Sequence, residues 1–78
     1  EPVHIRLAAR AAAWALARPG LALVERSGDG GAVVAVQGAS EDWATRFALS
    51  FGGDAEVLSP PAARRHFGET VKRALARY

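Results

Sequence analysis

Residues 48–61, ALSFGGDAEVLSPP, change secondary structure twice within a short stretch, and this constrains the fold more than any other feature. The helix-forming residues end at Gly52, where a residue without a Cβ can adopt the left-handed conformation that terminates many helices. Residues 54–58 then have strand character. Ser59 before two prolines is typical of the cap and first turn of a new helix. The segment predicts helix, strand and helix with almost no loop between them.

The first strand is predicted over residues 3–7, where apolar and polar side chains alternate. This period of two places Val3, Ile5 and Leu7 on a face that helices cover, and His4 and Arg6 on the opposite face. A sheet with one covered and one open face follows from this pattern.

Residues 8–18 are dense in alanine and predict a helix that stops before Pro19-Gly20. The alanines leave its buried face open between two sets. These sets are Ala11, Ala12 and Ala15, or Ala9, Ala13 and Leu16. Trp14 is compatible with both of these faces. Its side chain could lie in the core or at an interface.

Residues 21–26 and 32–37 are β-leaning runs joined by a loop that contains Asp29-Gly30, which predicts a hairpin. Ser40 is a candidate cap for a helix that reaches Ser50, and two acidic residues in its first turn favour that start. A last helix is predicted over residues 61–77, with apolar residues at spacings of three and four.

Taken together, the pattern predicts an α+β fold, the ferredoxin-like β-α-β-β-α-β sandwich with an extra C-terminal helix. We expect a four-stranded antiparallel sheet of order 4-1-3-2, with the first two helices on one face, because the apolar residues of the first strand need a cover. We expect residues 1–78 to form a single domain.

The chain contains no methionine and begins at Glu1, so we expect a processed piece or an excised domain. It also contains no cysteine, which removes disulfides and thiolate metal sites. No apolar run reaches the roughly 20 residues of a membrane span. We expect a cytoplasmic protein without a membrane partner, and its small core favours association.

Positive charge is concentrated in residues 60–78, which carry five Lys or Arg against one Glu. A cluster of this kind attracts phosphate, although a solvated helix face is the more common explanation of such a run.

Catalytic arrangements are missing from the pattern. The two histidines lie far apart in sequence, and the loop with Gly28 and Gly30 joins two strands instead of leading into a helix N-terminus. Asp54 and Glu56 share a strand face but have no histidine or cysteine beside them. We therefore expect no catalytic residue, no metal and no cofactor.

Several families share this order of elements. An acylphosphatase-like site needs an asparagine, and a copper-chaperone-like site needs paired cysteines, and this chain has neither. RNA-recognition motifs stack bases on aromatic residues of the central strands, which are absent at the matching positions here. An ACT-like domain that senses a small molecule remains the alternative.

Six features in order resemble the C-terminal extension, or WCX domain, of WYL-domain transcription regulators. They are Val3, Ile5, Arg6 and Leu7 in the first strand, the Asp29-Gly30 hairpin, the helix ending Leu49-Ser50-Phe51-Gly52, the strand Ala55-Glu56-Val57-Leu58 before Pro60, the early helical Arg64, and the terminal Ala74-Leu75-x-Arg77-Tyr78. The resemblance covers essentially the whole chain.

This resemblance implies a regulatory and dimerisation module excised from the C-terminus of a longer regulator. In that family the extension follows a winged helix-turn-helix domain and a WYL domain, and some members respond to single-stranded DNA. The implied partners are a second copy, these two adjoining domains, and single-stranded DNA or another anionic effector.

The residues expected to bind such an effector are Arg6 and Arg64, with His4 and Arg65 in support. A guanidinium on a central strand can hold phosphate with two hydrogen bonds, although a salt bridge to an acid on a neighbouring strand is an equal alternative for Arg6. Arg64 is poorly placed for the helix dipole and invites a partner, either a phosphate or an acid such as Asp54 or Glu56.

Overall fold

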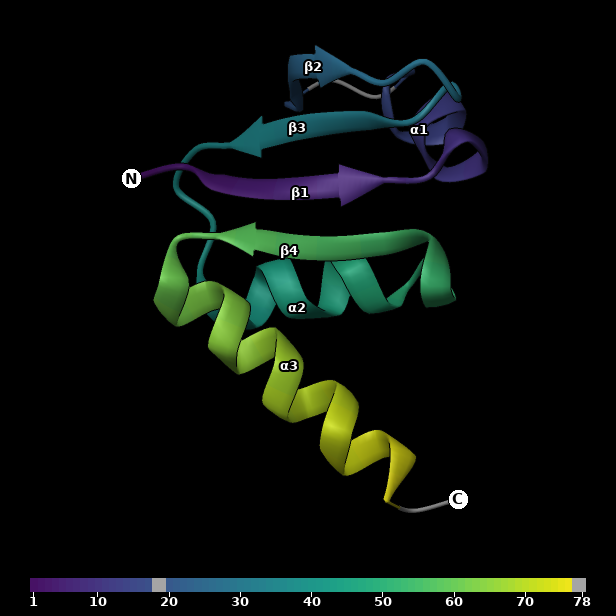
Figure 1. Ribbon diagram of the computed structural model, residues 1–78. Coiled ribbons are helices and arrows are strands. Elements are labelled where there is room, and N and C mark those ends of the chain that lie inside the picture. Colours follow the sequence, from purple (N-terminus) through teal and green to yellow (C-terminus); the bar gives the residue numbers. More distant parts are fainter. Residues whose placement is uncertain (18–19, 77–78) are drawn as a thin grey trace.

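The computed structural model describes residues 1–17 and 20–76 of the chain. In chain order the elements are β1 (Val3–Leu7), α1 (Ala9–Ala15), β2 (Ala22–Arg26), β3 (Ala32–Val36), α2 (Glu41–Leu49), the 3-10 turn η1 (Gly52–Asp54), β4 (Ala55–Ser59) and α3 (Pro61–Leu75). The strands form one antiparallel sheet of order β2-β3-β1-β4 (Figure 1). This confirms the predicted order, read here from the opposite edge.

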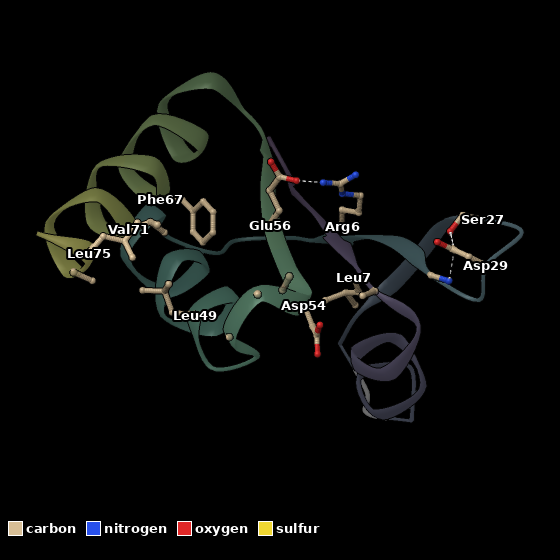
Figure 2. A pocket seen from close by; sticks show the side chains of 16 residues that line it. Arg6, Leu7, Ser27, Asp29, Leu49, Asp54, Glu56, Phe67, Val71 and Leu75 are labelled. Atoms are coloured by element: carbon tan, nitrogen blue, oxygen red, sulfur yellow. Dashed lines mark hydrogen bonds and ion pairs between the residues drawn. The ribbon is translucent and has the colours of Figure 1, made fainter. Parts of the chain in front are cut away.

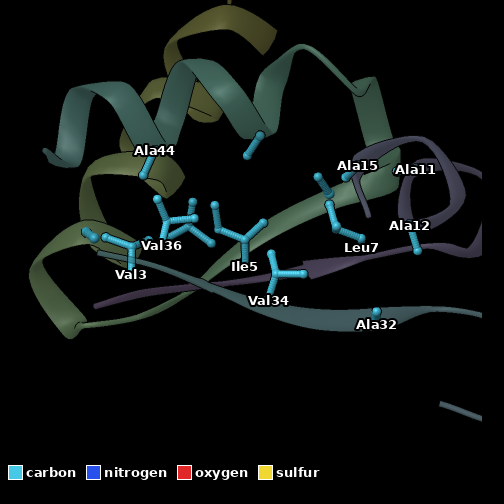
Figure 3. Packing of buried hydrophobic residues seen from close by; sticks show 14 residues of the cluster. Val3, Ile5, Leu7, Ala11, Ala12, Ala15, Ala32, Val34, Val36 and Ala44 are labelled. Atoms are coloured by element: carbon cyan, nitrogen blue, oxygen red, sulfur yellow. The ribbon is translucent and has the colours of Figure 1, made fainter. Parts of the chain in front are cut away.

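The core lies between the sheet and the first two helices. Side chains of β1 and β3 point from one face of the sheet toward α1 and α2 (Figure 3). Ile5, Leu7 and Val34 are completely buried there, as the alternation of β1 predicted. Alanines of all three helices complete this core, so the helices contribute little side-chain volume to it.

Helix α1 buries Ala11, Ala12 and Ala15, which settles the choice between the two alanine faces. It is shorter than the predicted 8–18. Ala8 occupies the N-cap position without a capping side chain, and Arg18 and Pro19 lie outside the described residues. Helix α2 begins as predicted, because the Ser40 hydroxyl accepts a hydrogen bond of 3.0 Å from the amide of Trp43.

Four aromatic rings form a row that connects α1 to α2. Trp43 stacks on Phe47 with 5.0 Å between centroids, Phe47 meets Phe51 edge-on at 5.1 Å, and Phe51 meets Trp14 edge-on at 5.4 Å. Both tryptophans stay partly exposed, at 47% and 39%. Trp14 and Trp43 therefore pack at the surface of the helical layer and not within the core.

The hairpin between β2 and β3 forms as predicted. Asp29 accepts hydrogen bonds from the Ser27 hydroxyl at 2.6 Å and the Gly31 amide at 2.9 Å. These two bonds hold the pKa of Asp29 below its usual range, the bond from Ser27 contributing most. Gly30 has a φ of +91°, a conformation that favours glycine.

The prediction for residues 48–61 is wrong in its boundaries around β4. Gly52 has the expected left-handed φ of +63°. The 3-10 turn η1 follows, and β4 spans Ala55–Ser59 instead of the predicted residues 54–58. Ser59, however, is the last residue of β4 and not the helix cap. Pro60 occupies the N-cap position of α3, and the Ser59 hydroxyl instead meets Nδ1 of His4 at 3.0 Å.

Helix α3 packs on α2 and β4 and then runs away from the sheet (Figure 1). Its first turns are fixed by the fully buried Ala63. The described helix ends at Leu75, and the predicted Arg77 and Tyr78 lie outside the described residues.

Candidate functional site

The two arginines singled out from the sequence meet at one carboxylate, that of Glu56. Arg6 on β1 and Glu56 on β4 are direct partners in the antiparallel register, and both side chains point to the open face of the sheet. Nη2 of Arg6 donates to Oε1 of Glu56 (Figure 2). The alternative of a salt bridge to a neighbouring strand therefore holds in this structure.

Arg64 reaches the same carboxylate from a different element. It lies in the first turn of α3, where its amide donates to the Pro60 carbonyl at 3.0 Å. Its Nη2 lies 4.0 Å from Oε2 of Glu56, so each carboxylate oxygen faces one guanidinium. The pairing of β1 with β4 and the start of α3 thus bring two cations that lie 58 positions apart in the sequence onto one acceptor.

This three-residue cluster is open to solvent. The side chains of Arg6 and Arg64 are 63% and 62% exposed, and that of Glu56 is 34% exposed. Exposed ion pairs of this kind each contribute only about 0–1 kcal/mol to stability. The cluster therefore contributes little to stability. Because both guanidinium groups are exposed, an anion from solution could compete with Glu56 for them.

The two supporting residues have different positions. His4 lies two residues before Arg6 on the same face of β1, and its ring is held by Ser59 at 3.0 Å. Arg65 follows Arg64 by one residue, about 100° around the helix. It is exposed and has no hydrogen bond or ion pair within the described residues. The structure brings His4 to the cluster side of the sheet but does not bring Arg65 into contact with it.

Two residues of the site had a weaker signal in the sequence. Glu56 was one of two acids considered for Arg64, and only the strand register shows that it also pairs with Arg6. Ser59 was assigned a capping role because two prolines follow it. Its contact with His4 depends on a register shift between β1 and β4 at residues 4 and 5, which no local pattern predicts.

Within residues 1–17 and 20–76, no three His, Cys, Asp or Glu side chains are grouped so that they could hold a metal ion. None of the helices in this part of the chain combines the length and the apolar character that a membrane crossing requires.

The fold and the cluster together define a small α+β module with an open, charged sheet face. Residues 1–75 match the family model of the WCX domain. The chain therefore belongs to the WCX domain family, which confirms the resemblance of its motifs to the C-terminal extension of WYL-type transcription regulators. Membership in this family makes it a regulatory module.

Curated relatives support the same assignment. The chain is 36% identical over 70 residues to Protein PafC of Mycobacterium tuberculosis strain CDC 1551 / Oshkosh and, equally, to Protein PafC of strain ATCC 25618 / H37Rv. The aligned region covers 90% of this chain but 22% of each relative. The chain thus spans about a fifth of the length of the curated relatives that it matches.

Proposed function

We propose that this chain is a non-enzymatic sensing and assembly module of a cytoplasmic WYL-type regulator, and that its open sheet face binds an anionic effector, with single-stranded DNA as the leading candidate. In this role it pairs with a second copy and contacts adjoining WYL and winged helix-turn-helix domains. Family membership supports the regulatory role. The observation that carries the effector site is the convergence of Arg6 and Arg64 on one exposed carboxylate.

The chemistry of the cluster favours phosphate as the ligand group. A phosphate oxygen can accept the same hydrogen bonds that the Glu56 carboxylate accepts, and arginine is suited to such planar, two-point contacts. Contacts to successive phosphates would make binding salt-dependent. The logarithm of the binding constant should fall against the logarithm of the salt concentration with a slope of about −0.7 for each phosphate neutralised on a single strand. The open face offers no aromatic ring of β1, β3 or β4 for base stacking, so sequence preference should be weak.

The first test is a fluorescence-anisotropy titration with a short single-stranded oligonucleotide at low salt. Arg6→Ala and Arg64→Ala should each weaken binding about three- to tenfold, which corresponds to roughly 1 kcal/mol. Arg46→Ala is the matched control, because it removes the same charge from α2, where Arg46 pairs with Asp42 at 3.1 Å. Absence of binding by the parent, or an equal loss in the control, would contradict the proposed site.

A second test uses the carboxylate itself. If Glu56 competes with phosphate for the arginines, Glu56→Gln should strengthen oligonucleotide binding by up to about fivefold, because an exposed ion pair is worth about 0.2–1 kcal/mol. Glu69→Gln changes the net charge equally from an exposed position of α3. An equal gain in both variants would mean that only overall charge matters, and the assignment of Glu56 would fall.

A further inference from the structure

The two arginines of the cluster converge on one point. Arg6 donates to Oε1 of Glu56, and Nη2 of Arg64 lies 4.0 Å from Oε2 of the same residue. A single carboxyl carbon joins these two oxygens, whereas a whole sugar separates neighbouring phosphates of a nucleic acid strand. The spacing of the guanidinium groups therefore suits one phosphate that contacts both arginines better than two successive phosphates of a strand.

The charges of the cluster are not balanced. Arg6 and Arg64 carry two positive charges, and Glu56 supplies one negative charge. Neither arginine forms a second ion pair within the described residues. A phosphodiester inside a strand also carries one negative charge, so it would leave the same imbalance if it replaced the carboxylate. A phosphate monoester carries about −1.5 to −2 at pH 7 and has three free oxygens, so it balances both guanidinium groups.

The exchange of Glu56 for a phosphate requires little rearrangement of the backbone. Arg6 lies on β1, which is paired on both sides within the sheet, and the amide of Arg64 is bonded to the Pro60 carbonyl in the first turn of α3. The Glu56 side chain is 34% exposed, and ion pairs of such exposed groups are weak. The carboxylate can therefore turn away while the two arginines stay in position.

An open groove of about 790 Å³ begins beside the cluster (Figure 2). It lies between α3 and the edge of the domain where β1 ends and β4 begins, and Arg6 and Glu56 are among the residues that line it. Pockets of roughly 300–1,000 Å³ hold small organic ligands. A group attached to a phosphate at the two arginines therefore has room to continue into the groove.

The lining of the groove favours a nucleoside over a further phosphate. Its α3 wall is apolar and includes Val71 and Phe67, whose ring points from α3 toward β4 in Figure 2. Asp29 and Asp54 also line the groove and repel a second phosphate. An aromatic ring offers a stacking surface to any base, because every base has a π face. The groove is therefore suited to a base, and its Arg6 end to a phosphate.

We propose that the cluster binds the terminal phosphate of a single strand. The phosphate monoester contacts Arg6 and Arg64 in place of Glu56, and the base of the terminal nucleotide lies in the groove against Phe67. The terminal sugar lies at the rim, from which the strand continues over the open sheet face. A 5′ and a 3′ phosphate present the same monoester. This inference rests on the proposed function, because it names the part of the strand that the anion site recognises.

The test compares three strands of one sequence by fluorescence anisotropy with the parent chain at low salt. They carry a 5′ phosphate, a 3′ phosphate or no terminal phosphate, and the label is on an internal base so that both ends are free. One phosphorylated strand should bind at least about fivefold more tightly than the unphosphorylated strand, and this strand identifies the recognised end. Equal affinity of all three strands would overturn the terminal-phosphate site.

Two altered strands test the parts of the site separately. A methyl ester of the preferred terminal phosphate keeps the phosphorus but has a single negative charge, so it should lose most of the gain. Removal of the terminal base should weaken binding of the phosphorylated strand at least about threefold, and removal of an internal base should cost less. A methyl ester that keeps the full gain, or an equal cost of the two base removals, would contradict the proposed site.

Arg64→Ala is the matching variant of the protein. It should reduce the ratio of the affinities for the phosphorylated and unphosphorylated strands to about one, because one guanidinium cannot balance a monoester. Arg46→Ala should keep the ratio, since Arg46 pairs with Asp42 on α2 and removes the same charge. A ratio that stays in Arg64→Ala, or that is lost in Arg46→Ala, would overturn the assignment.

The terminal-phosphate site and the proposed function fail in different ways. If all strands bind equally well and Arg6→Ala and Arg64→Ala weaken binding of each, the anion site stands and only the preference for a strand end is wrong. If neither phosphorylated nor unphosphorylated strands bind, the proposed effector function and this inference are both wrong.

Discussion

The two edges of the sheet are built differently. At one edge, all five residues of β2 are exposed, and the strand is held to the sheet by β3 alone, with a register shift between Leu23 and Glu25. At the other edge, β4 buries Ala55 and Val57 and packs against both α2 and α3. Antiparallel strands can form an edge by hydrogen bonds alone, but a packed edge gains apolar burial as well.

The candidate functional features also lie at only one of the two sheet edges among the described residues. Glu56, which gathers the two arginines, lies on β4, and the groove lies between β4 and α3. On the β2 side, Leu23 and Val24 are exposed to solvent. Within the described residues, no residue of β2 takes part in an ion pair. If the proposed function is correct, the edge of the sheet that gains most from packing is also the edge that contacts the ligand.

The largest effect should come from trimming a buried side chain at the packed edge. Val57→Ala removes two methyl groups worth about 0.8 kcal/mol each and leaves a cavity, so we expect a loss of roughly 2 kcal/mol in the free energy of unfolding. Leu23→Ala on the exposed edge should cost less than about 1 kcal/mol, because the side chain is 47% exposed. Urea unfolding of both variants measures the two losses in the free energy of unfolding. Equal losses would contradict the difference between the packed edge and the exposed edge.

A smaller effect is expected at the helix caps. Ser40→Ala removes the bond to the Trp43 amide and should cost about 1 kcal/mol, the typical value for losing such a cap. Ala8 already has the extended conformation of an N-cap, with φ −69° and ψ 164°, so Ala8→Ser should stabilise α1 by up to about 1 kcal/mol.

The control for this pair is Ala13→Ser, an exposed position inside α1. Serine there cannot cap the helix and is a poorer helix former than alanine, so a small loss is expected. If Ala8→Ser stabilises the protein no more than Ala13→Ser, the missing cap does not limit α1.

The smallest effect concerns the hairpin and its pH dependence. The pKa of Asp29 is lowered in the folded state by the hydrogen bonds from Ser27 and Gly31. Its stabilising contribution is therefore complete above the ordinary aspartate pKa and is lost as the pH falls through the lowered value. Asp29→Asn should flatten this acid-side part of the stability profile, and Ser27→Ala should reduce it. Urea unfolding from pH 7 to pH 2.5 measures both, and an unchanged profile in Asp29→Asn would contradict the assignment.

Local patterns were sufficient for most of the fold. Alternation along β1 gave the core face, Asp29-Gly30 gave the hairpin, and Ser40 gave the start of α2. The arrangement of α1 could not be predicted, because alanines on both faces give no hydrophobic contrast and only the fit against the sheet selects Ala11, Ala12 and Ala15. Ser59 was misassigned because prolines after a serine resemble a cap even where the strand continues.

The candidate site was predicted in part for a related reason. The types and faces of Arg6 and Arg64 follow from local spacing, but their meeting at Glu56 depends on the pairing of β1 with β4, strands about 50 residues apart in the chain. The groove depends on the direction in which α3 leaves the sheet, which long-range packing on α2 and β4 decides. Contacts of this kind leave no trace in a short window of sequence.

The most direct test of the account is an amide NMR titration of the chain with a short single-stranded oligonucleotide at low salt. We predict that shifts concentrate in β1, in β4 around Glu56 and in the first turn of α3 around Arg64, while the amides of β2 and α1 stay in place. The shift changes should diminish as the salt concentration is raised, because phosphate contacts release counterions. Shifts centred on β2 or on the helical layer, or no shifts at all, would contradict the claim that the β4 edge carries the function.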